Sequence, residues 1–175
     1  MMIKIKLFSI IITFVLCFPL HFVFDFFPIK IVTPFVPVNE SIWEHMKLIF
    51  TSFVISNFIE DYLLRNKNIY INNKYLQMFI SPIIGIIIYL IIFIPLYNNF
   101  GENLFISLFL LFIVIIIEHI ISYYIYNFKD IKYEKLIGII GLIIVYIIFY
   151  ILTYYPIKTP LFFDELNQNY GINKE

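Results

Sequence analysis

The stretch Pro34-Phe-Val-Pro-Val-Asn-Glu-Ser-Ile-Trp-Glu-His-Met-Lys47 decides how this chain is organised. It joins a proline-rich turn to the start of a helix, and it gathers ionisable and amide side chains in an otherwise apolar sequence. Ser41 and Glu44 form a capping-box pattern, in which the Ser41 hydroxyl accepts from the Glu44 N–H and the Glu44 carboxylate reaches back to the Ser41 N–H. The pattern predicts a helix that starts at Ser41.

The composition around this stretch indicates a membrane protein. Of 175 residues, 62% are hydrophobic and 14% are charged, whereas soluble domains have roughly 45–50% and about 25%. We therefore expect a multi-pass protein of the cell membrane, surrounded by the lipid bilayer. The formal net charge is zero and no dense basic run occurs, which argues against a nucleic-acid partner. The single cysteine, Cys17, excludes an intrachain disulfide.

Long apolar segments predict an all-α fold, a polytopic transmembrane helix bundle of about five spans. About 20 helical residues cross a hydrocarbon core of roughly 30 Å. The predicted spans cover residues 5–27, 41–64, 75–97, 104–128 and 136–155, within one bundle of residues 1–155. Residues 156–175 form an aromatic and polar tail that we expect on the membrane surface.

The distribution of basic residues predicts the orientation. One side carries eight Lys or Arg residues: Lys4, Lys6, Arg65, Lys67, Lys74, Lys129, Lys132 and Lys135. The other side carries four: Lys30, Lys47, Lys158 and Lys174. This excess predicts a cytoplasmic N-terminus and an outer C-terminus, with the Pro34 to Lys47 stretch and the tail on the outer face. The parity changes if the segment 41–64 only dips into the membrane.

Polar residues of the first span form one helical stripe that leads to this outer face. They are spaced four residues apart: Thr13, Cys17, His21 and Asp25. His21 lies about 9 Å, and His45 about 6 Å, from the outer ends of their predicted helices at 1.5 Å per residue. The two histidines are therefore expected to meet, with Asp25 level with Glu40.

These positions define a candidate polar site with eight members: His21, Asp25, Asn39, Glu40, Glu44, His45, Lys47 and Asp164. Imidazole and carboxylate groups are ligands for a divalent metal such as zinc, and His21, His45 and Glu44 are the predicted metal ligands. The same groups could instead act as a general base and its orienting acid on a small-molecule or lipid ligand, as in a membrane-embedded hydrolase.

Two other functional interpretations stay open. In a small transporter or accessory subunit, a polar path would run from His45 through Ser52 and Ser56 to Glu60. In a structural or interaction protein, Ser41 and Glu44 would only cap the helix. In that case Asn39 would close the turn, and His45 and Lys47 would reach water at the interface.

A second pair, Glu118 and His119, lies too deep in the fourth span to join the outer site. We expect it to pair with Ser52, Ser56 or Glu60 across the bundle, and the alternative is a proton or ion path. Glu60 and Asp61, near the inner end, are expected to reach water or to pair with Arg65.

The stretch Pro37-Val-Asn-Glu-Ser-Ile-Trp-Glu-His-Met-Lys-Leu48 resembles the pattern P-V-N-E-S-x-W-E-H-x-K-L of DUF6512, a family of small multi-pass bacterial membrane proteins of unknown function. Further similar positions are His21, Phe24, Asp25, Ile59, Glu60, Tyr155, Pro156, Pro160, Leu161, Phe162, Asp164, Tyr170 and Gly171. The chain departs from the family pattern at Ile157 and Glu165, where the family has prolines. Glu118 and His119 match no family motif. The resemblance implies a fold and a topology but no reaction.

Overall fold

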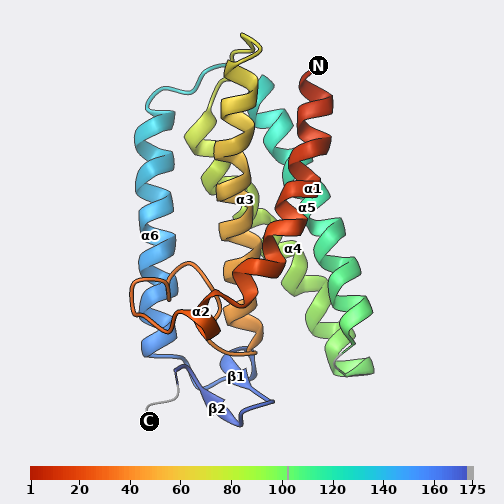
Figure 1. Cartoon of the computed structure of the whole chain (residues 1–175), viewed down its shortest axis with the longest axis vertical. Coiled ribbons are helices and arrows are strands. Elements are labelled where there is room, and N and C mark those ends of the chain that lie inside the picture. The colour runs from red at the N-terminus through yellow and green to blue at the C-terminus, as the bar shows by residue number, and fades with distance from the viewer. Residues whose placement is uncertain (102, 173–175) are drawn as a thin grey trace.

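The computed structural model describes residues 1–101 and 103–172 as a bundle of long helices with a small hairpin at one end (Figure 1). The helices are α1 (Met2–His21), α2 (Val23–Phe26), α3 (Ile42–Arg65), α4 (Lys74–Phe100), α5 (Leu104–Asn127) and α6 (Glu134–Tyr154). The tail contains the 3₁₀ helix η1 (Pro160–Phe162) and the strands β1 (Phe163–Asp164) and β2 (Asn169–Tyr170). The predicted all-α class is confirmed.

Each predicted span corresponds to a helix whose ends lie within a few residues of the prediction, with one interruption. The first span contains Pro19 and is interrupted at Phe22, so it consists of α1 and the short α2. Within the described residues, four segments are long and apolar enough to cross a membrane: Met2–Phe26, Lys74–Phe100, Leu104–Asn127 and Glu134–Tyr154. Such segments are typical of a membrane protein, and α3 differs from them.

α3 is as long as the other helices but carries charged side chains, and it runs through the middle of the bundle (Figure 1). Its buried polar residues are Glu44, Lys47, Thr51, Ser52, Ser56, Asn57, Glu60 and Asp61. An ionised group that faces lipid at mid-depth costs at least about 2.5 kcal/mol. The neighbouring helices remove this cost, because they cover the polar face of α3, whereas exposed α3 side chains such as Phe58 and Ile59 are apolar.

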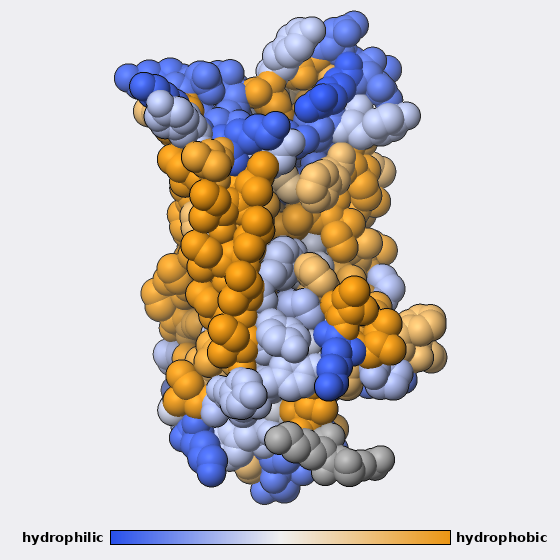
Figure 2. Space-filling model, turned by 90° about the vertical axis from the view of Figure 1, so that its left-hand side faces the viewer, coloured by the Kyte–Doolittle hydropathy of each residue, from blue (hydrophilic) through white to orange (hydrophobic). Residues whose placement is uncertain are grey.

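The surface shows an apolar band between two hydrophilic ends (Figure 2). The N-terminus and the α3–α4 and α5–α6 connections lie at one end, which we call the N-terminal end (Figure 1). The α2–α3 loop and the hairpin lie at the opposite end, the tail end (Figure 1). The Pro34 to Lys47 stretch and the tail thus share one end of the bundle, as predicted. That this end faces outward stays a prediction.

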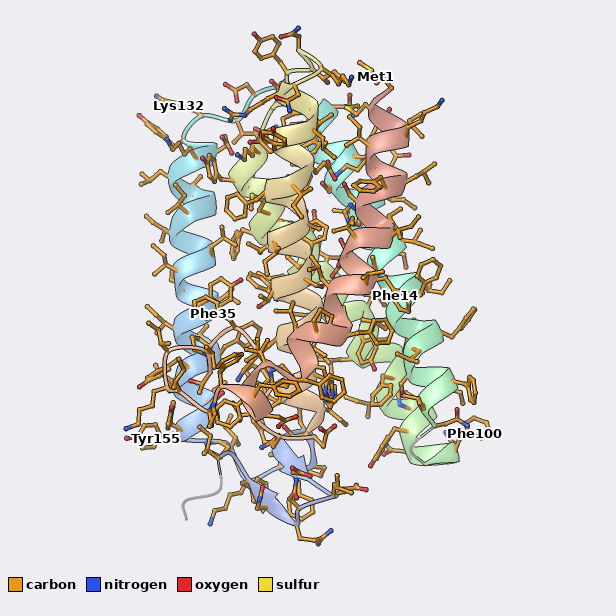
Figure 3. All side chains as sticks on the ribbon, in the orientation of Figure 1. Met1, Phe14, Phe35, Phe100, Lys132 and Tyr155 are labelled. Atoms are coloured by element: carbon orange, nitrogen blue, oxygen red, sulfur yellow. The ribbon has the colours of Figure 1, made fainter. Side chains whose placement is uncertain are left out.

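Aromatic contacts fasten the loop and the tail to the helices. Phe35 of the α2–α3 loop lies against Tyr146 of α6, with ring centroids 4.7 Å apart (Figure 3). Phe162 of η1 is buried, 4.8 Å from the ring of Trp43 in α3. β1 and β2 pair antiparallel, with Phe163 opposite Tyr170. These contacts hold the tail against the start of α3.

Candidate functional site

Two histidines and one glutamate meet at the tail end. His21 lies at the last residue of α1, Glu40 ends the α2–α3 loop, and His45 is in the first turns of α3. The two imidazole Nε2 atoms are 3.1 Å apart. The Glu40 Oε2 atom lies 3.6 Å from the His21 Nε2 and 3.5 Å from the His45 Nε2. We call His21, Glu40 and His45 the triad.

The local backbone sets the orientation of the His45 ring. The Ser41 hydroxyl accepts from the Glu44 N–H and so fixes the start of α3. The His45 Nδ1 lies 2.9 Å from the Ser41 carbonyl oxygen. A carbonyl oxygen only accepts, so Nδ1 carries the hydrogen, and in the neutral ring the Nε2 lone pair faces the triad. A metal-binding histidine is usually oriented by such a hydrogen bond.

The tail holds Glu40 in place through its backbone. The Glu40 N–H donates to Asp164 Oδ2 at 3.1 Å. The Asn39 amide donates to the Gly171 carbonyl at 2.8 Å, and its oxygen accepts from the Ser41 N–H. The pKa of Glu40 is lowered because the His21 imidazole contacts its carboxylate, with the His45 ring adding to this effect against partial burial. The triad therefore contains an anionic oxygen and two ring nitrogens.

The spacing of these three atoms fits a tetrahedral zinc ion. Bonds of roughly 2.0–2.1 Å hold neighbouring ligand atoms about 3.3 Å apart around tetrahedral zinc, and the three separations here are 3.1, 3.5 and 3.6 Å. Of the described residues, these three form a group able to hold a metal ion. Their side chains are 25%, 41% and 31% exposed for His21, Glu40 and His45, so a further ligand can approach from outside the protein.

A pocket of about 290 Å³ lies next to the residues that hold Glu40, and it is lined by Asp25, Asn39 and Asp164, among others, but by none of the triad residues. Asn39 precedes Glu40 in the chain, and Asp164 binds the Glu40 N–H. Ligand pockets usually have volumes of roughly 300–1,000 Å³. A metal-binding geometry and a space for a small group therefore lie on neighbouring parts of the tail end.

A family model described as a family of unknown function, DUF6512, matches residues 2–172. The chain belongs to the DUF6512 family. No curated protein and no solved structure matches it. The match confirms the resemblance drawn from the Pro37 to Leu48 motif. It covers nearly the whole length of this DUF6512 protein.

Glu44 and Lys47, two predicted site residues, do not join the triad. Lys47 is 0% exposed and forms an ion pair with Glu44 at 2.5 Å. The Lys47 ammonium also donates to the Thr33 carbonyl, and Thr153 of α6 donates to the Glu44 Oε1. The pair joins α3 to α6 and to the loop, so the interpretation that Lys47 reaches water is wrong.

The capping box forms only in part. The Ser41 hydroxyl caps as predicted, but the Glu44 carboxylate accepts from the Val38 N–H rather than from the Ser41 N–H. Asn39 takes the Ser41 N–H instead. The buried Lys47 draws the Glu44 carboxylate inward, which explains the difference.

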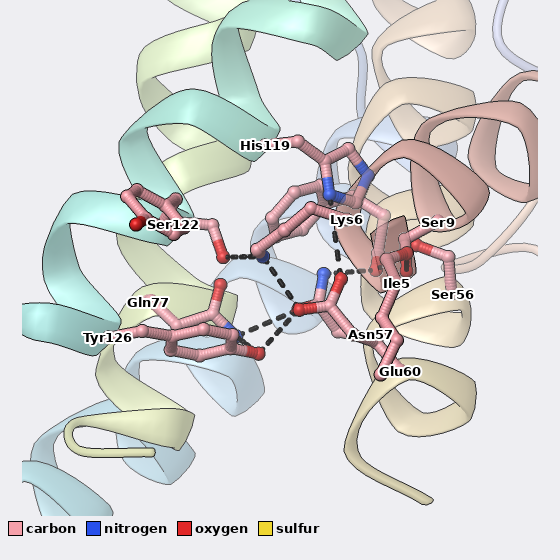
Figure 4. A network of polar contacts seen from close by, with 12 residues as sticks. Ile5, Lys6, Ser9, Ser56, Asn57, Glu60, Gln77, His119, Ser122 and Tyr126 are labelled. Atoms are coloured by element: carbon pink, nitrogen blue, oxygen red, sulfur yellow. Dashed lines mark hydrogen bonds and ion pairs between the residues drawn. The ribbon is translucent and has the colours of Figure 1, made fainter. Parts of the chain in front are cut away.

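A second polar network lies inside the bundle, nearer the N-terminal end (Figure 4). The Lys6 ammonium of α1 contacts Glu60 of α3 at 2.8 Å and donates to Ser122 of α5 at 2.6 Å. His119 Nδ1 lies 3.7 Å from Glu60, and Thr13 Oγ1 contacts both His119 Nε2 and Ser56. We call Lys6, Glu60, His119 and their partners Thr13, Ser56 and Ser122 the inner network. His119 thus lies beside Glu60, as expected. Glu118 has no hydrogen-bond partner among the described residues, so the expected pairing is wrong for this residue.

The inner network corrects two expectations. Glu60 is 0% exposed and pairs with Lys6, so it does not reach water. Asp61 pairs with Arg65, as expected, and also with Lys74 at 2.6 Å. The expectation that Lys6 belongs to the basic residues at one membrane face is corrected as well, because Lys6 is buried inside the bundle. Its position three residues before Ser9, which continues the four-residue stripe of Thr13 and Cys17, is the signal that places it inside the bundle.

An apolar layer separates the triad from the inner network. Cys17 lies one turn from His21 towards Thr13, and it packs in a cluster with Leu48 and Ile115. These three side chains are 4%, 5% and 0% exposed. The polar residues of α1 and α3 therefore fall into two main groups, and between them the Cys17 Sγ contacts the buried Ser52 hydroxyl at 3.4 Å.

Proposed function

We propose that this protein is a zinc-dependent hydrolase embedded in the cell membrane, with its metal held by His21, Glu40 and His45 at the outer face. The observation that carries the proposal is the triangle of ligand atoms, whose sides match the ligand spacing around tetrahedral zinc. Structural zinc sites usually have four protein ligands, whereas catalytic sites have three and leave one position open. Two histidines and one glutamate form a catalytic type of ligand set.

The roles of the residues follow from their contacts. Zinc bound by three protein ligands lowers the pKa of a bound water to about 7 and polarises a substrate oxygen. Ser41 orients His45 through its carbonyl, and Asp164 positions Glu40 through its backbone N–H. Asp25 lines the adjacent pocket with an exposed carboxylate, so it is the group placed to accept a proton there. The substrate would be a small molecule or a lipid that enters this pocket.

The two other interpretations fit the described contacts less well. A path from His45 through Ser52 and Ser56 to Glu60 would cross the apolar layer of Cys17, Leu48 and Ile115, where the Ser52 hydroxyl is buried against the Cys17 thiol. A purely structural motif would satisfy all its side chains with protein partners. Asn39, Glu44 and Lys47 are satisfied in this way. The two histidines instead direct ring nitrogens at each other beside a carboxylate.

Zinc content of the detergent-purified protein tests the metal site. We expect about one zinc ion per chain in the wild type and a loss of zinc in His21→Ala, Glu40→Gln and His45→Ala. Glu165→Gln changes an exposed tail carboxylate and should retain the metal. Helicity by circular dichroism and the elution volume verify that each variant is folded. Equal, negligible zinc in the wild type and in the folded triad variants would overturn the proposal.

Hydrolysis of chromogenic carboxyl and phosphate esters tests the reaction. We expect turnover by the zinc-loaded wild type that a chelator abolishes and added zinc restores. His45→Ala should show neither turnover nor restoration. A zinc-loaded wild type that hydrolyses no ester faster than His45→Ala would contradict the hydrolase and leave the metal site intact.

A further inference from the structure

Glu118 of α5 is a buried acid that forms no polar contact within the described part of the chain. Its side chain is 0% exposed, and neither carboxyl oxygen has a hydrogen-bond partner among residues 1–101 and 103–172. It lies against Gly85 of α4, where a Cβ atom would overlap the Glu118 carboxyl group. Gly85 therefore provides the space that this carboxyl group occupies.

A second polar group without a partner lies on the same face of α4. Ser81 is one helical turn from Gly85 and 0% exposed, and its hydroxyl has no partner among the described residues. A carboxyl group and a hydroxyl thus lie near each other in an apolar interior, each with unused hydrogen-bonding capacity. Buried polar groups are nearly always paired, so such exceptions point to a ligand or a functional state.

The surroundings of Glu118 favour its neutral form. An ionised carboxylate without a partner is very costly in a medium of low polarity, whereas a protonated one is much less so. Glu60, by contrast, has Lys6 at 2.8 Å and can stay ionised. The Glu118 carboxyl and the Ser81 hydroxyl do not supply enough oxygen atoms for magnesium or calcium, which take six or more oxygen ligands. The ligand that fits is a proton.

We propose that Glu118 is an intramembrane proton-binding site that exchanges its proton with the N-terminal end of the bundle. The neighbouring residue His119 belongs to the inner network, which continues to Glu60 and Lys6 near the start of α1 (Figure 4). Tyr89 of α4 and Val114 of α5 lie one helical turn from the contact of Gly85 with Glu118 on the tail-end side, and both are buried in one apolar cluster that closes the route to the tail end. On release, the carboxyl O–H bond breaks, the proton passes to water at the N-terminal end, and a carboxylate remains. Uptake reverses this step.

Labelling with dicyclohexylcarbodiimide, an apolar reagent, tests the protonated state. The carboxyl proton moves to a carbodiimide nitrogen, the carboxyl oxygen bonds to the central carbon, and an acyl shift gives a stable N-acylurea without a leaving group. We expect peptide mass spectrometry of the folded wild type to find the label at Glu118 and not at Glu60, which serves as the internal control. Glu118→Gln should lose the label. Absence of the label at Glu118, or equal labelling of Glu60, would overturn the proposal.

Proteoliposomes test the side of access. Added protease digests the tail only in molecules whose tail end faces the outside of the vesicle, which distinguishes the two orientations of the protein. The pH is then raised on one side of the vesicle at a time. Labelling of Glu118 should fall when the alkaline buffer bathes the N-terminal end, because the carboxyl group loses its proton to that side. Alkaline buffer at the tail end should have no effect. The reverse pattern, or equal loss from both sides, would contradict one-sided exchange.

Discussion

The triad and the inner network contain the same kinds of side chain but have different roles. Both contain histidine and glutamate, and both join α1 to α3. The triad is partly exposed and contains no lysine or arginine, whereas Lys6 and Glu60 are 6% and 0% exposed and neutralise each other. The comparison teaches that burial and a fixed counter-charge decide the role. A buried glutamate that is paired with a lysine, such as Glu60, stabilises the bundle. A partly exposed glutamate without a lysine or arginine partner, such as Glu40, is available to bind a metal ion.

This division makes the two regions separable by mutation. The apolar layer of Cys17, Leu48 and Ile115 stands between them, so removal of a charge on one side should leave the other side intact.

The largest effect is expected at the buried ion pair. Lys6→Met leaves the Glu60 carboxylate buried without its counter-charge, and loss of one partner of a buried pair costs about 3–5 kcal/mol. Thermal unfolding in detergent measures the loss of stability. Zinc content should be unchanged in the molecules that fold, because the triad lies beyond the apolar layer.

Two further variants make this prediction specific. Lys4 is exposed, so Lys4→Met should leave the free energy of unfolding nearly unchanged. The double variant Lys6→Met/Glu60→Met should recover most of the lost stability, since no charge is then left unpaired. A double variant as unstable as Lys6→Met alone would show that the ion pair is not the reason.

The second effect concerns zinc and the triad. A ligand that binds the folded state at 100 times its dissociation constant stabilises it by about 2.7 kcal/mol. Zinc at that excess should raise the unfolding temperature of the wild type and of Lys4→Met by similar amounts. His45→Ala should show no such rise. A zinc-dependent rise that persists in His45→Ala would locate the metal elsewhere.

Some of this arrangement could be predicted from the sequence, because it depends on local order along the chain. Helix periodicity and span length predict the helices, and depth matching along two spans brings His21 to His45. The Ser41 cap depends on residues three apart. Each of these predictions uses distances along one helix, which the α-helical rise fixes.

The rest depended on contacts between distant segments. A lysine at the start of a span, such as Lys6, can extend to water or point into the bundle. Here the outcome depends on Glu60, which is 54 positions later in the sequence (60 − 6 = 54). Glu44 is drawn from the Ser41 N–H by Lys47 and Thr153, the latter on α6. Glu40 rather than Glu44 therefore completes the triad. No local pattern distinguishes the two glutamates, since the tail that holds Glu40 is far away in sequence.

The third effect is expected at the contact between Gly85 and Glu118. Gly85→Ala introduces a Cβ atom that overlaps the Glu118 carboxyl group, and overpacking of a tight interior typically costs about 1–3 kcal/mol. Thermal unfolding should show this loss. The double variant Gly85→Ala/Glu118→Ala removes the overlapping group, so it should be more stable than Gly85→Ala alone. If Glu118→Ala gives no relief in the Gly85→Ala background, the two residues are not in contact.

The smallest effect is expected at Ser41, where one substitution separates the helix cap from the metal site within the Pro34 to Lys47 stretch. Ser41→Ala removes the side-chain cap of α3, and loss of such a cap typically costs about 1 kcal/mol. The Ser41 carbonyl that orients His45 belongs to the backbone and survives the substitution, so the zinc content should stay at the wild-type level. Ser41→Asn keeps a side chain that can cap and should unfold close to the wild type. His45→Ala should show the opposite behaviour, with zinc lost and the metal-free stability little changed, because the imidazole is partly exposed. Loss of zinc in a folded Ser41→Ala variant would mean that the hydroxyl, and not only the backbone carbonyl, positions the triad, so the cap and the metal site would form one unit.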